Sequence, residues 1–151
     1  MAYSFSETTL RLLHKAGWHD GYQKDTTDYQ EALKKEGYPI HPSVISFLTR
    51  FGGLHVTHPH ARVPDMEDWF DLDPAKAAAN VSIRAIKNGY NKRVDNELCV
   101  IGEAFRGYMV LMMAPDDKVY AGYDDLMVSV GDSGEDAIEA LCTGRELPEV
   151  P

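Results

Sequence analysis

The chain has 151 residues, enough for one folded domain spanning residues 1–151, and its 44% hydrophobic and 26% charged residues exclude disorder over the whole length. The net charge of −9 disfavours binding to nucleic acid, because an acidic surface repels phosphate groups, and it favours a basic partner. Acidity of this degree is also common in cytoplasmic proteins that use charge only for solubility.

The sequence has no segment typical of secretion or of a membrane. Glu7 and polar neighbours stand where a signal peptide needs an apolar run, and the longest apolar run, residues 109–114, is far too short to cross a bilayer. Cys99 and Cys142 lie among apolar neighbours outside any CxxC motif, so we expect buried, reduced thiols. These features together predict a cytoplasmic protein without a membrane partner.

Three helices are predicted in the first third of the chain, because each segment repeats its apolar residues with a helical period. They run between Ser6 and Gly17, from Thr27 to Gly37, and from Pro42 to Gly52. Ser6 is a favoured capping residue, and Thr27 and Gln30 have the spacing of a capping box. Proline suits the first helical position, and glycine suits the position after the last.

The middle of the chain gives weaker signals. Residues 54–58 alternate like a short strand, and residues 69–70 are typical of another, with a loop indicated over residues 59–66 by its two prolines. Asp73 and Pro74 can open a helix that continues through residues 75–79. We expect residues 81–88 to be helical and the polar residues 88–97 to form a loop.

The last third predicts strands followed by a helix. The expected strands are residues 98–101, which end at Gly102, then 108–113, 118–122 and 126–130, with a hairpin turn at residues 115–117. Ser133 and Asp136 have capping spacing at the start of the closing helix, which ends at Gly144. Helices, then strands, then a helix predict an α+β single domain with a mostly antiparallel central sheet flanked by helices.

Three histidines near one predicted strand are the candidate metal ligands. His58 and His60 would share a face of that strand and His55 would lie on the other, and imidazole with nearby carboxylates suits zinc. Pro59 disturbs the strand, and the spacing matches no recognised ligand motif. We therefore interpret them as exposed histidines at a polar strand end, and we expect no metal and no cofactor.

Enzymatic chemistry has little support. Both cysteines fall at apolar positions, and the sequence contains no GxSxG, P-loop, GxGxxG or deaminase zinc motif. The many paired carboxylates stand mostly in turns and at helix starts, where carboxylates are favoured without any catalytic role. We expect no catalytic residue and no enzyme.

Two clusters mix carboxylates with large aromatic residues, a combination that suits an interface with an aromatic anchor and a charged rim. The candidate partner-binding residues are Asp65, Glu67, Asp68, Trp69 and Asp71 in the first cluster and Tyr120, Tyr123, Asp124 and Asp125 in the second. Core packing is the alternative role for Trp69, and a contact on the sheet face is the alternative for Tyr120.

Several segments, in their order and spacing, resemble the SUKH superfamily of SMI1/KNR4-like proteins. They are FLTRFGGL at residues 47–54, VIGEA at residues 100–104, FDLDP at residues 70–74, the pair Gly17-Trp18 and EGYP at residues 36–39. The set looks closest to the SUKH-3 subgroup and covers residues 5–147. The resemblance implies an α+β fold with no catalytic residues.

The resemblance also implies a function. Proteins of this kind neutralise toxins of bacterial polymorphic or contact-dependent systems, often nucleases. We therefore expect a cognate toxin to be bound by stoichiometric occlusion, and the net charge of −9 favours a basic one. Two alternatives stay open from the sequence: a non-enzymatic regulatory or small-ligand-binding module on the same fold, and a metal-dependent hydrolase built on the histidines. The toxin, the interface and the oligomeric state stay open as well.

Overall fold

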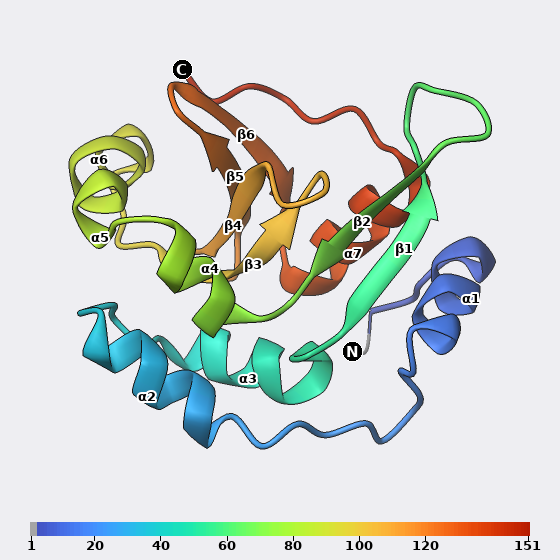
Figure 1. Ribbon diagram of the computed structural model, residues 1–151, viewed down its shortest axis with the longest axis horizontal. Helices are drawn as coiled ribbons and strands as arrows, with labels where there is room; N and C mark the ends of the chain where they lie inside the picture. The colour runs from blue at the N-terminus through green and yellow to red at the C-terminus, as the bar shows by residue number, and fades with distance from the viewer. Residues whose placement is uncertain (1–2) are drawn as a thin grey trace.

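The computed structural model describes residues 3–151, whose strands form one open sheet with helices on both sides (Figure 1). The strands are β1 (His55–Pro59), β2 (Glu67–Asp71), β3 (Cys99–Ala104), β4 (Met109–Met113), β5 (Val119–Tyr123) and β6 (Leu126–Gly131). The helices are α1 (Glu7–Lys15), α2 (Thr27–Lys35), α3 (Pro42–Phe51), α4 (Pro74–Asn80), α5 (Ile83–Ala85), the π-helix η1 (Ile86–Tyr90), α6 (Asn91–Val94) and α7 (Gly134–Thr143). The strand order follows the chain and all neighbours are antiparallel, so the predicted α+β class is confirmed.

The caps of the first and last helices confirm two predictions. The Ser6 hydroxyl accepts a hydrogen bond from the amide of Thr9 at 3.2 Å, and the Ser133 hydroxyl accepts one from the amide of Asp136 at 3.1 Å. Each bond satisfies a backbone donor that the first helical turn leaves free. Gly144 ends α7 with a φ of +68°, a conformation that glycine adopts without steric cost.

The predicted capping box of α2 is wrong by one residue. The cap is Thr26, whose hydroxyl accepts a hydrogen bond from the side chain of Gln30 at 2.8 Å. Thr27 is already the first helical residue, because Asp25 accepts hydrogen bonds from its amide at 3.0 Å and its hydroxyl at 2.7 Å. The Thr27 hydroxyl thus bonds to Asp25, two positions upstream, and does not cap the helix.

Different helices cover the two faces of the sheet. Residues paired across strands point to the same face, so Asp71, Glu103 and Gly122 share one. Lys76 and Asn80 of α4 contact the first two, and we call this side the α4 face. Helix α7 packs against β6 and β1 on the other side, which we call the α7 face, together with α1, and Figure 1 shows α4 and α7 on different sides of the strands.

The predicted loop over residues 88–97 is wrong as far as residue 94, because residues 83–94 form a nearly continuous helical run through α5, η1 and α6. Tyr90 anchors this run: it is only 7% exposed, and its hydroxyl donates to the carbonyl of Asp124 at 2.9 Å. The ring lies directly on Gly122, where an added Cβ would stand 2.4 Å from the ring. A contact with a strand more than 30 residues away thus holds a polar segment in a helix.

Gly102 lies inside β3, and the prediction that it ends the strand is wrong. The strand continues to Ala104 through an irregularity in its pairing with β4 between Val100 and Gly102. A Cβ at Gly102 would stand 2.1 Å from the carbonyl oxygen of Asp71, so only glycine lets β2 approach β3 here. The β2–β3 seam pairs through a single residue couple, Asp71 with Glu103.

The C-terminal residues cover the outer edge of β6. The amide of Ser129 donates to the carbonyl of Pro148 at 2.8 Å, and the amide of Val150 donates to the carbonyl of Met127 at 2.7 Å. The Arg93 guanidinium of α6 donates to the carbonyls of Val150 and Pro151 and holds the tail in place. This edge of the sheet therefore presents few free backbone groups.

His58 is buried on the α7 face, which contradicts the interpretation of exposed histidines. It pairs with the buried Asp68 across β1 and β2, and its ring centroid lies 5.7 Å from that of Phe70. Its Nδ1 donates to the carbonyl of Pro59 at 2.9 Å. Burial lowers the pKa of His58, against a smaller opposite effect of the Pro59 hydrogen bond and of Asp68.

Gly102→Ala should destabilise the protein by about 3 kcal/mol, because the new methyl group overlaps the Asp71 carbonyl and forces β2 away from β3. Urea unfolding at constant m value measures the change. Gly89→Ala is the matched control: nothing lies within 4 Å of the added Cβ, and alanine in place of a helical glycine should stabilise by about 0.5–1 kcal/mol. Equal effects of the two substitutions would contradict the close approach.

The free energy of unfolding should fall as the pH falls through about 6.5, the ordinary histidine pKa, because the unfolded chain protonates His58 more readily than the folded chain does. His58→Gln should remove that part of the pH dependence. An NMR titration of the His58 ring gives its pKa directly. A value at or above the ordinary one would contradict the inferred burial effect.

Candidate partner-binding surface

The first predicted acidic cluster does not form one patch, because side chains alternate along β2. Glu67, Trp69 and Asp71 point to the α4 face, whereas Asp68 points to the α7 face beside His58. Asp65 stands in the protruding loop between β1 and β2, visible in Figure 1. The strand therefore divides the five residues among three places.

Trp69 is half-buried and lies on the surface of the α4 face, not in the core. Its ring centroid is 4.9 Å from that of His55 and 5.3 Å from the ammonium of Lys76. On its other side a Cβ added to Gly107 would stand 3.4 Å from the indole. The ring thus forms a wall between the β1–β2 hairpin and the turn that joins β3 to β4.

Asp71 and Glu103 form a pair of buried carboxylates at the β2–β3 seam, 6% and 5% exposed. Lys76 Nζ lies 3.1 Å from Asp71 Oδ2 and 3.8 Å from Glu103 Oε1, and the Asn80 amide donates to Glu103 Oε2 at 3.0 Å. The hydrogen bond to Asp71 is the main cause that raises the pKa of Lys76. One ammonium faces two carboxylates, and Asp71 Oδ1 is buried without a hydrogen-bond partner.

A hollow of about 430 Å³ opens beside Glu103 on the α4 face. Two of its residues, Tyr108 and Tyr123, are 71% and 52% exposed, which is unusual for rings of this size. We call it the acidic hollow; it is lined by Ala77, Asn80, Val81, Tyr90, Glu103, Gly107, Tyr108, Val110, Gly122, Tyr123 and Asp124. That lining holds two carboxylates and three tyrosines, and no lysine or arginine.

Sequence reasoning missed Glu103 and Tyr108. Glu103 belongs to a segment that was interpreted as a glycine turn, and Tyr108 was expected to start a strand. Phe105, Arg106 and Gly107 all have positive φ, from +54° to +84°, and this left-handed turn brings Tyr108 out into solvent. Phe105 and Arg106 are not residue types that favour positive φ, so the sequence does not predict this turn.

The second predicted cluster is also divided. Tyr123 and Asp124 line the acidic hollow, and Asp125 is the exposed residue that follows them in the turn to β6. Tyr120 lies two residues from Gly122 and shares its face of β5, but it is not among the residues that line the hollow. Burial is the main cause that raises the pKa of Tyr120, followed by Asp116, which stands at the other end of the strand.

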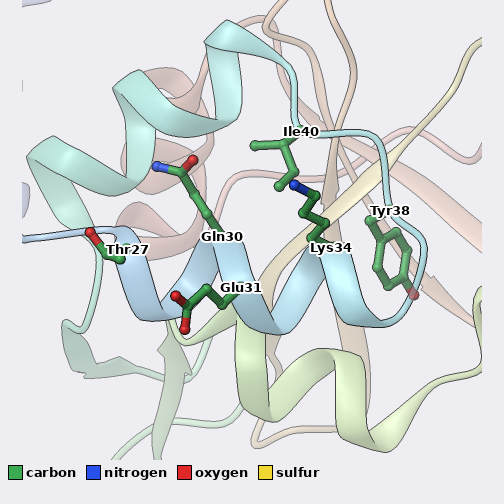
Figure 2. Close-up of a pocket in the computed structure, with 6 residues that line it drawn as sticks. All are labelled: Thr27, Gln30, Glu31, Lys34, Tyr38 and Ile40. Atoms are coloured by element: carbon green, nitrogen blue, oxygen red, sulfur yellow. The ribbon is translucent and has the colours of Figure 1, made fainter.

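Two other hollows are less suited to a charged partner. Figure 2 shows the first, about 480 Å³, where Thr27, Gln30, Glu31, Lys34, Tyr38 and Ile40 line the side of α2 with charges of both signs. The second, about 640 Å³, lies on the α7 face over an apolar floor that includes Phe105, Met109 and Val128, with Arg62 and Arg145 among its lining residues. Neither contains an exposed aromatic pair.

The two cysteines lie in the core, and the histidines do not gather into a metal site among the described residues. Cys99 and Cys142 are free and buried as predicted, and burial raises the pKa of each thiol to about 12, which opposes reactivity at neutral pH. Within residues 3–151 no group of three or more histidine, cysteine or acidic residues could hold a metal ion. No helix in that range is long and apolar enough to span a membrane.

A comparison with protein families identifies a match over most of the chain. A family model described as SUKH-3 immunity protein matches residues 5–144, a span that includes every helix and strand from α1 to α7. No curated protein matches the chain, and no solved structure does. The match also contains the segments 47–54 and 100–104 that carried the resemblance in the sequence. The chain therefore belongs to the SUKH-3 immunity protein family.

Proposed function

We propose that this protein binds a cognate bacterial toxin and neutralises it by stoichiometric occlusion, with the acidic hollow at the centre of the interface. The toxin belongs, in this proposal, to a polymorphic or contact-dependent system and is a basic protein such as a nuclease. The immunity protein works in the cytoplasm, where the toxin would otherwise attack its target. Binding alone is sufficient, so no catalytic residue and no cofactor take part.

The observation that carries the proposal is the pair of exposed tyrosines at the acidic hollow. Tyr108 and Tyr123 are 71% and 52% exposed and stand beside Glu103 and Asp124. Tyrosine anchors bury a large area with little loss of side-chain entropy and are enriched at interface hot spots. A rim of carboxylates around such anchors suits a partner that carries positive charge.

The net charge of −9 supports the same mechanism. Long-range attraction between an acidic immunity protein and a basic toxin accelerates their encounter, and it does so most at low ionic strength. A nuclease presents a basic groove to the phosphates of its substrate. Carboxylates at the acidic hollow can occupy that groove in place of the phosphates and so exclude the nucleic acid.

Six of the sequence-predicted residues enter the proposed interface and three do not. Glu67, Trp69 and Asp71 lie on the α4 face next to the hollow, and Tyr123, Asp124 and Asp125 lie at its opposite rim. Asp65 stands in the protruding loop, Asp68 lies on the other face and Tyr120 lies at the far end of β5. Tyr108 and Glu103 are added to the interface because they line the hollow.

Co-expression tests the proposal. A candidate toxin, encoded beside this gene, is induced in cells with and without the protein, and the complex is purified for size and stoichiometry. Growth inhibition that the protein relieves, together with a one-to-one complex, supports occlusion. A toxin that is inactivated without forming a stable complex would contradict it.

Charge reversal at the rim should weaken the complex. Asp124→Lys with Asp125→Lys is expected to lower the affinity for the toxin by about tenfold or more, chiefly through slower association, because both side chains are exposed and help to steer a basic partner. Surface plasmon resonance at several salt concentrations measures both rates. The control is Glu31→Lys on α2 with Glu36→Lys just after it. This variant changes the net charge equally and should lower the affinity much less. Equal loss in both variants would mean that only net charge matters.

A further inference from the structure

We propose that the acidic hollow takes the side chain of one arginine from the toxin, with its guanidinium against Glu103. This inference rests on the proposed function for the identity of the partner, and on the geometry of the hollow for the chemistry of the ligand. It deepens that function, because it names the group that the partner must present.

Glu103 has unused capacity to accept hydrogen bonds. Its Oε2 accepts from Asn80 at 3.0 Å, whereas its Oε1 accepts no hydrogen bond from residues 3–151. Lys76 Nζ is 3.8 Å from that oxygen but 3.1 Å from Asp71, so its ammonium serves mainly Asp71. Although Glu103 is only 5% exposed, it lines the hollow, so a ligand in the hollow can reach it. A cationic donor that enters the hollow can therefore form a charge-assisted hydrogen bond with this free oxygen.

The local charge also favours a cation. Asp71, Glu103 and Asp124 carry three negative charges around the hollow. Lys76 supplies one positive charge from its α4 side, and Arg93, which donates to the carbonyl of Asp125, supplies a second at the rim. Arg106 donates to the backbone of Glu67 outside the hollow. No lysine or arginine is among the residues that line it.

The aromatic lining distinguishes a guanidinium from other cations. Tyr90, Tyr108 and Tyr123 all contribute to the hollow, and a planar guanidinium can stack on such rings while it donates to a carboxylate. Tyr108 is largely exposed, so closing its ring over an arginine buries apolar surface as well. The available volume, about 430 Å³, accommodates a single long side chain. A metal ion fits less well, because the seam offers two carboxylates with an ammonium between them.

An NMR titration tests the site without the toxin. N-acetyl-arginine N-methylamide is added to the labelled protein, and the citrulline analogue, which has nearly the same shape and no charge, serves as the ligand control. We expect saturable shifts of the backbone amide signals of Gly107 and Gly122, and of the side-chain amide signals of Asn80, with arginine only. Absence of saturable shifts, or equal shifts with citrulline, would overturn the inference.

Two variants locate the binding. Glu103→Gln and Tyr108→Ala should each weaken arginine binding by about tenfold, the effect expected when a charged hydrogen bond or a stacking ring is lost. Tyr108 is 71% exposed, so Tyr108→Ala should leave the fold intact. It therefore tests arginine binding even if Glu103→Gln disturbs the pairing of β2 with β3. Glu36→Gln, which removes an exposed carboxylate at the end of α2 that does not line the hollow, should bind arginine like the unchanged protein. Unaltered binding in Glu103→Gln and Tyr108→Ala overturns the assignment.

Binding of the two variants to a toxin distinguishes the failure of this inference from the failure of the proposed function. Glu103→Gln and Tyr108→Ala should lose affinity for a neutralised toxin along with affinity for the arginine probe. A toxin that binds both variants as tightly as it binds the unchanged protein overturns the arginine contact and leaves stoichiometric neutralisation standing. Arginine binding by a protein that neutralises no toxin would instead overturn the proposed function, and with it the identity of the partner.

Discussion

The β2–β3 seam is the constraint on which the rest of the structure depends. The β1–β2 hairpin joins the four-stranded meander through one residue couple, Asp71 and Glu103, and only the missing side chain of Gly102 allows that approach. The same pairing forces two carboxylates together on one face of the sheet. Helix α4 then covers them, and its Lys76 and Asn80 supply the donors that make their burial tolerable.

The proposed recognition surface follows from this arrangement without disturbing the core. The core of the protein lies in the strands and under α3 and α7, where β3 and β4 are buried along their whole length. The acidic hollow lies at the border of that core, where the left-handed turn before β4 and the turn after β5 bring tyrosines to the surface. Substitutions of those exposed tyrosines can therefore alter the surface of the hollow while the fold stays the same.

Local signals in the sequence predicted the helices and strands, and they failed where a distant contact decided the outcome. Ser6 and Ser133 were found because a cap depends on residues within one turn. The helical run up to Val94 was missed because it depends on Tyr90 resting on Gly122. The period of two residues along β2 was available and would have separated Asp68 from Trp69. The exposure of Tyr108 was not available, because no glycine marks two of the three left-handed residues before it.

The tail that covers β6 has a consequence for self-association. A sheet grows when strands add to edges whose amides and carbonyls are free. In the part of the chain that the structure describes, β6 is already paired with residues 148–150, whereas β1 pairs only with β2. Copies of this protein can thus join edge to edge only through β1, which gives a dimer and then stops. A fibril built by strand addition would first have to peel the tail away from β6.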